Sequence, residues 1–170
     1  MRDGSWRPAL LSLIFFLTGC ARTEYHKTQS HPRAASIVSY AFEAGQTPDF
    51  GWPAPGKVTR YFGAREGGAP RKGVTVRTAP GAEVTASAAG TVGFVDPSLE
   101  GYGSTVVIEH SAEYATVIAG LTDLSVSAGQ SVRKGERLGK AAVGTDGACT
   151  YYFEIRRHAR AEDPLSRLSV

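Results

Sequence analysis

The stretch that decides the fold is Gly101-Tyr-Gly-Ser-Thr-Val-Val-Ile-Glu-His110, which is soon followed by Tyr114-Ala-Thr116. Its β-branched residues and its alternation of side chains predict two consecutive strands, at residues 104–110 and 114–119. Gly101 and Gly103 precede the first strand, and glycine permits turns in which another residue would be strained. The stretch therefore predicts short strands separated by glycine turns.

The same pattern continues outward over the region from Phe50 onward. It predicts further strands at residues 57–62, 73–77, 83–86, 91–95 and 151–156. No segment of this region has a convincing helical period. The predicted fold class is therefore mainly β.

Two segments of this region resemble each other. Pro80-Gly-Ala-Glu-Val84 is followed by Gly90-Thr-Val92, and Ala128-Gly-Gln-Ser-Val132 is followed by Gly135 and Leu138. Each segment predicts a turn, a strand, a second turn and a second strand. Such a repeat suits a barrel-like sandwich built from two similar halves.

The repeat is also typical of biotinyl and lipoyl carrier domains. Those domains need a lysine displayed on a hairpin between the two halves. Lys134 and Lys140 lie in the second half instead, which argues against a carrier.

At the beginning of the chain, Leu17-Thr-Gly-Cys20 closes a short apolar run that starts near Ala9 and follows Arg2 and Arg7. This arrangement is typical of a lipoprotein signal. An ordinary secretory leader or a membrane anchor is the alternative, but a spanning helix needs roughly 20 apolar residues. We therefore expect a signal peptide at residues 1–19 and a lipid on Cys20.

The next residues differ in composition from the rest. Residues 21–33 are polar and predict a disordered tether, whereas residues 34–42 predict a short helix or a first strand. As a flexible coil, the segment to Asp49 would span roughly 30 Å. The expected organisation is a signal peptide (1–19), a lipidated N-terminus and flexible tether (20–49) and one domain (50–170).

The charge of the chain is mild, at +3, and does not argue for a nucleic-acid partner. A basic cluster near the C-terminus consists of Arg156, Arg157, His158 and Arg160. It is either a solvated strand end or a face for an anionic polymer or an acidic partner.

One cysteine, Cys149, has no partner if Cys20 carries lipid, so no internal disulfide is expected. Free cysteines are usually buried, and we expect burial of Cys149, with an exposed reactive thiol as the alternative.

Over residues 50–168 the chain resembles the LytM or lysostaphin-type zinc endopeptidases, which cut peptidoglycan cross-links. The landmarks that carry the resemblance include Phe50-Gly-Trp-Pro53, Tyr61-Phe-Gly63, Lys72-Gly-Val74, the stretch 101–110, Tyr152-Phe-Glu-Ile155 and Asp163-Pro-Leu165. The resemblance implies that family's antiparallel β-sandwich or barrel-sandwich hybrid, the duplicated hybrid motif.

The resemblance also locates the family's catalytic positions, and there the chain departs from the pattern. The first ligand pair, His-x-Gly-x-Asp, falls on Arg71-Lys-Gly-Val-Thr75. The second motif, His-x-His followed by Phe and Glu, falls on Thr150-Tyr-Tyr152, so the base becomes Thr150 and the third ligand Tyr152. The remaining catalytic histidine falls on Gly120.

These replacements predict no catalytic residue, no metal and no cofactor. Zinc needs three neutral or anionic ligands around an open position. Arg71 beside the dication would be repelled by on the order of 8 kcal/mol at about 4 Å and a dielectric near 20. His110 is expected to be structural or exposed, and Cys149 has no second or third ligand near it.

A chain that keeps a scaffold without its catalytic groups is expected to be a pseudoenzyme. It resembles the degenerate LytM factors of the EnvC and NlpD kind, especially in Tyr151-Tyr-Phe-Glu-Ile-Arg-Arg157. That resemblance implies a lipoprotein that binds and activates a periplasmic peptidoglycan (N-acetylmuramoyl-L-alanine) amidase during cell-wall remodelling and daughter-cell separation. The expected location is the periplasmic face of the outer membrane.

The expected binding site is the groove at the former catalytic positions, lined by Arg71, Thr75, Gly120, Thr150 and Tyr152. Two other functions remain open: a non-catalytic module that binds peptidoglycan, and a residual zinc endopeptidase.

Overall fold

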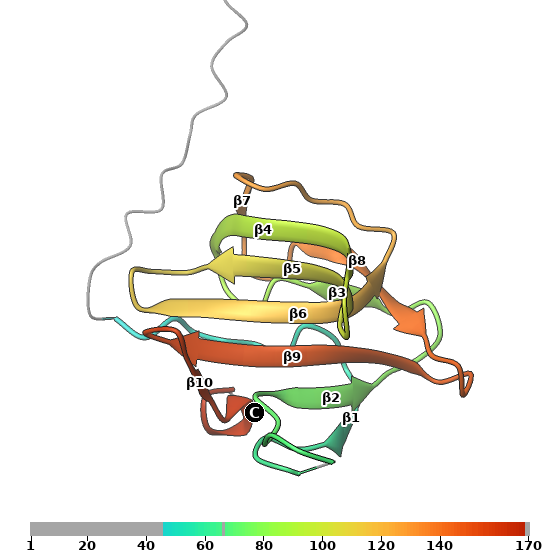
Figure 1. Cartoon of the computed structure of the whole chain (residues 1–170). Helices are drawn as coiled ribbons and strands as arrows, with labels where there is room; N and C mark the ends of the chain where they lie inside the picture. Colours follow the sequence, from blue (N-terminus) through green and yellow to red (C-terminus); the bar gives the residue numbers. More distant parts are fainter. Residues whose placement is uncertain (1–45, 66, 169–170) are drawn as a thin grey trace, which may run out of the picture. The chain divides into compact units, whose positions relative to one another are not determined.

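The strands of the chain are arranged in one antiparallel sheet (Figure 1). The computed structural model describes residues 46–65 and 67–168, and within them the sheet has ten strands. They are β1 (Lys57–Arg60), β2 (Val74–Arg77), β3 (Glu83–Thr85), β4 (Gly90–Leu99), β5 (Gly103–Glu109), β6 (Tyr114–Thr122), β7 (Ser131–Val132), β8 (Arg137–Val143), β9 (Cys149–Arg157) and β10 (Arg160–Glu162). A short 3-10 helix, η1, follows at Pro164–Ser166.

The order of the strands brings distant parts of the sequence together. The path is β1, β2, β9, β8, β6, β5, β4 and β7, while β10 pairs with β9, β3 with β8, and β6 also with β9. In Figure 1, β3 and β8 lie behind the layer formed by β4, β5 and β6. Buried side chains from both layers form one hydrophobic cluster.

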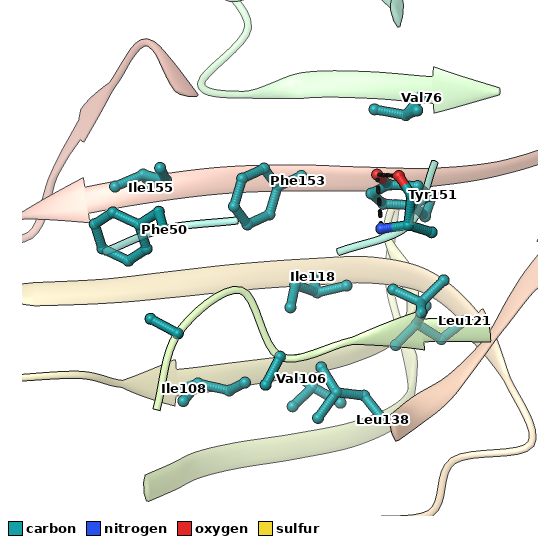
Figure 2. Packing of buried hydrophobic residues seen from close by; sticks show 14 of the residues in the cluster. Phe50, Val76, Val106, Ile108, Ile118, Leu121, Leu138, Tyr151, Phe153 and Ile155 are labelled. Carbon is teal, nitrogen blue, oxygen red and sulfur yellow. Dashed lines mark hydrogen bonds between the residues drawn. The ribbon is translucent and has the colours of Figure 1, made fainter. Parts of the chain in front are cut away.

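Alternation of side chains along the strands builds this core. Figure 2 shows Ile108 of β5, Ile118 of β6 and Phe153 of β9 within the cluster. Phe50 lies ahead of the first strand and is also fully buried. Its ring contacts Tyr114 edge to face, with centroids 5.9 Å apart, so residues just before the sheet complete the core.

The two similar sequence segments pair with each other. In β3 and β8, Val84 is opposite Gly139, and in β4 and β7, Gly90 is opposite Val132. Each segment forms a turn, a strand, a turn and a strand, as the sequence predicted. The prediction of a mainly β, antiparallel fold is confirmed.

The predicted strands are all present, but several ends were wrong. β1 stops at Arg60 because the chain turns at Tyr61 and Gly63, where φ is +78°. β4 continues to Leu99, and β9 begins at Cys149. The burial predicted for Cys149 is confirmed, since only 4% of it is exposed.

Strand β10 was missed because its turn contains no glycine. His158 and Ala159 form that turn with φ of +45° and +61°, a conformation that non-glycine residues rarely adopt.

The signal peptide, Cys20, the tether and the element expected at 34–42 lie outside the described residues. In the part of the chain that is described, no helix is long and apolar enough to span a membrane.

Candidate functional site

A pocket of about 610 Å³ lies beside β2, β6 and β9. All five positions at which the resemblance placed catalytic groups line it: Arg71, Thr75, Gly120, Thr150 and Tyr152. The other lining residues are Arg60, Ala69, Pro70, Lys72, Gly101, Tyr102 and Tyr151. The fold thus brings the predicted groove residues together in one site.

Strand register explains why these side chains share one face. Thr75 of β2 is opposite Tyr152 of β9, and Ala119 of β6 is opposite Tyr152 on its other side. Arg60 of β1 is in turn opposite Thr75. Directly opposite residues point to the same face of an antiparallel sheet, and Thr150 lies on that face because it is two residues from Tyr152.

Gly120 marks the place where β6 changes its neighbour. Up to Ala119 the strand pairs with β9, and from Leu121 it pairs with β8. Its φ is +73°, and its N–H donates to the Tyr102 carbonyl oxygen at 3.1 Å. An L side chain at this φ costs about 1–3 kcal/mol, so this backbone disfavours the histidine that the family motif places here.

Arg71 closes one side of the pocket. Its Nη2 donates to Thr75 Oγ1 at 2.8 Å, and its guanidinium carbon lies 5.9 Å from the centroid of the Tyr152 ring. The backbone N–H of Arg71 donates to the Ala64 carbonyl, and its own carbonyl accepts from the Gly63 N–H. The loop before β2 therefore holds the guanidinium against Thr75 and Tyr152, the two other positions at which the resemblance expects a ligand.

A chain of polar contacts runs from the pocket along the outer face of β9. The Tyr152 hydroxyl donates to Glu154 Oε2 at 2.6 Å, and Arg156 Nε donates to Glu154 Oε1 at 2.6 Å. Glu154 is fully buried. The pKa of Tyr152 is raised above its ordinary value of 10.0, mainly by burial and then by the hydrogen bond to Glu154 and the negative charge of Glu154. The phenol consequently keeps its proton and acts as a donor.

This donor set does not fit zinc. Zinc is bound by thiolate, imidazole and carboxylate lone pairs, but the Arg71 guanidinium offers no lone pair and Tyr152 is a phenol that keeps its proton. Both oxygens of Glu154 are already hydrogen-bonded. Among the described residues, no group of three or more His, Cys, Asp or Glu side chains could hold a metal ion.

The two other candidate ligands lie outside the pocket lining. Cys149 is buried in the core on the side of β9 opposite to Thr150. His110 is fully buried, with Nδ1 against the Ala89 carbonyl and Nε2 against the Thr116 hydroxyl, both at 2.8 Å. His110 is structural, one of the two roles expected from the sequence.

Sequence reasoning missed Tyr102 as a pocket residue. Its ring packs edge to face against Tyr152, with centroids 5.5 Å apart, and 43% of the residue is exposed. The signal was an aromatic residue between Gly101 and Gly103, both of which have positive φ. Two tyrosines and a guanidinium therefore form the pocket wall, a surface suited to binding a peptide or a sugar.

Residues 69–164 match the family model described as peptidase family M23. All five groove positions fall within the matched residues. The crystal structure of a zinc containing peptidase from Vibrio cholerae is similar, with a TM-score of 0.61 and 25% identity, covering 68% of this chain and 39% of that one.

Two relatives of known sequence are similar over much of the chain. The lipoprotein YgeR of Escherichia coli K12 is 34% identical over 154 residues, or 86% of this chain and 60% of YgeR. The murein hydrolase activator NlpD of the same organism is 34% identical over 119 residues, or 69% of this chain and 30% of NlpD. The chain thus spans less than two thirds of either relative.

Proposed function

Because the chain belongs to peptidase family M23, we propose that it is a non-catalytic member which binds and activates a peptidoglycan (N-acetylmuramoyl-L-alanine) amidase. One observation carries the proposal. Every position at which the family motifs place a ligand or a catalytic histidine lines a single pocket, and arginine, threonine, glycine and tyrosine occupy those positions. The fold brings these positions together in one pocket, while the donor set there does not suit zinc.

The relatives support the activator role. NlpD is named a murein hydrolase activator, and its similarity extends over 69% of this chain. A groove that no longer cleaves can still hold a chain segment, since docking needs only a preformed cleft and a few anchors. We take Arg71, Tyr102 and Tyr152 as the anchors.

In the proposed mechanism, the groove receives a segment that blocks the amidase active site in the resting enzyme. Activation is then a population shift, limited by how much more tightly this protein binds the open amidase than the closed one. No covalent step is required of the chain.

The proposal includes an envelope location. Leu17-Thr-Gly-Cys20 predicts lipidation of Cys20, and YgeR is named a lipoprotein. A signal peptide at 1–19, a tether at 20–49 and the groove domain at 50–170 would place the groove near peptidoglycan on the periplasmic face of the outer membrane.

The test is dye release from labelled sacculi by the full chain alone, by its cognate amidase alone and by the two together. Release by the mixture far above that of the amidase alone is the expected result. Release by the chain alone would overturn the non-catalytic role. If the mixture matches the amidase alone while the chain pellets with sacculi, the chain is a wall-binding module and the activator proposal fails.

Groove variants connect the activity to the pocket. Arg71→Ala combined with Tyr152→Ala should abolish stimulation, and Thr150→Tyr should do so by filling the pocket without removing the Tyr152 contact to Glu154. Arg133→Ala, on an exposed turn, is the matched control, and thermal unfolding of each variant separates misfolding from lost binding. Stimulation that persists in a folded Thr150→Tyr variant would remove the groove from the mechanism.

A further inference from the structure

A second, smaller pocket adjoins the groove. It has a volume of about 300 Å³ and is lined by Lys72, Glu154, Arg156, Ala159, Arg160 and Ala161. Lys72 also lines the larger pocket, so the two share a wall. Most of the lining comes from the hairpin of β9 and β10 (Figure 1), in which the strand register places Ala161 opposite Arg156.

The charge of the small pocket is unbalanced. Lys72, Arg156 and Arg160 are positive and Glu154 is negative, which leaves two positive charges. Arg156 is the residue that neutralises Glu154, through Nε at 2.6 Å. Within the described residues, Lys72 and Arg160 make no side-chain hydrogen bond or ion pair.

The neighbouring basic residues are different, because each has an acidic partner. Arg157 and His158 lie 3.2 Å and 3.4 Å from Glu113 Oε2, and Arg167 lies 2.8 Å from Glu162 Oε2. The C-terminal basic cluster is therefore compensated except at the mouth of the small pocket. Uncompensated cations around a concavity favour an anionic ligand and raise the rate of its association.

We propose that the small pocket is an anion subsite which takes a carboxylate side chain of the amidase segment bound in the groove. The partner segment would place an uncharged part against Tyr102 and Tyr152 and an aspartate or glutamate between Lys72 and Arg160. Because the two pockets share a wall at Lys72, one continuous segment can occupy both of them. This inference rests on the proposed function and specifies the chemistry of its partner.

The test compares binding of the cognate amidase to the full chain and to a variant with Lys72→Ala and Arg160→Ala. Two partly exposed ion pairs predict roughly 3-fold to 30-fold weaker binding at about 50 mM NaCl, with a smaller difference at about 500 mM. Lys72→Glu should weaken binding further. The control combines Lys57→Ala and Arg133→Ala, which remove equal charge outside both pockets.

Equal binding of the amidase by the wild-type chain and the Lys72/Arg160 variant at low salt would overturn the subsite. So would a variant that loses only its affinity for sacculi, because the anion would then belong to the wall. If the wild-type chain neither binds nor stimulates the amidase, the proposed function itself fails, which this design separates from failure of the subsite.

Discussion

Lowering the pH should destabilise the domain through His110, which is fully buried. The Ala89 carbonyl can only accept, so Nδ1 carries the ring proton and Nε2 accepts from the Thr116 hydroxyl. Phe50 packs against the ring edge to face, with centroids 5.4 Å apart. Neutral imidazole therefore satisfies both contacts, and burial opposes the positive charge of imidazolium.

Burial lowers the pKa of His110 from 6.5 to about 4, against the opposing effect of the hydrogen bond to Ala89. Between these two values the unfolded chain binds the proton and the folded chain does not. The free energy of unfolding must then rise with pH across this window, and the stability is lost as the pH falls from 6.5 towards 4. At about 1.4 kcal/mol per pKa unit, the full effect is about 3 kcal/mol.

Urea unfolding at several pH values from 4 to 7.5 measures this dependence, with His110→Gln as the test variant. Glutamine also offers a donor and an acceptor but does not titrate. The variant should be less stable than the wild type at pH 7 and should lack about 3 kcal/mol of the wild-type pH dependence. Carboxylates titrate equally in both proteins and cancel in the comparison.

His158→Gln is the matched control, because the side chain of His158 is 63% exposed. It should keep the His110-dependent loss of stability between pH 6.5 and 4. Superimposable pH dependences for the wild type and His110→Gln would refute the reasoning, as would an NMR titration that places the pKa of His110 near 6.5.

Four further outcomes follow from the structure. Gly120→Ala should lower the free energy of unfolding by about 1–3 kcal/mol, because φ there is +73°; an unchanged urea midpoint would contradict the strain. Phe50→Ala should cost about 3–5 kcal/mol, since the ring is fully buried, and a loss below about 1 kcal/mol would mean that this segment is not part of the core. The Cys149 thiol should react with a thiol reagent only as fast as the domain opens, because 4% of the residue is exposed; immediate reaction in native buffer would show otherwise. Zinc added to the full chain should leave the thermal midpoint unchanged, and a zinc-dependent rise in the wild type would contradict the statement that these residues do not suit zinc. The double variant Arg71→His and Thr75→Asp tests whether introducing two ligands is enough for zinc binding.

Local features of the sequence predicted much of the fold correctly. Alternating β-branched residues marked β5 and β6, and glycines marked most turns. Family landmarks spaced along the chain predicted the architecture, and both the match to residues 69–164 and the likeness to the Vibrio cholerae peptidase confirm it. The ends of β1 and β4 were wrong because pairing with a neighbour, rather than propensity, decides where a strand stops.

The sequence predicted which residues stand at the positions that the resemblance assigns to catalytic groups, but it could not predict the contacts of those residues. The Tyr152 hydroxyl donates to Glu154, and Glu154 is buried only because the outer face of β9 is covered in the folded chain. Arg71 donates to Thr75 because of the way the loop before β2 turns. Neither contact has a local signal.

The sequence by itself determined which elements form, because side-chain alternation and glycine conformation act within a few residues. It also fixed which residue types, arginine, threonine and tyrosine, stand at the positions where the resemblance expects zinc ligands. Only the tertiary structure decided that these residues line one pocket and that Lys72 and Arg160 remain uncompensated beside it. The physical reason is that strand register sets which side chains meet, and register is chosen by burial across the whole sheet.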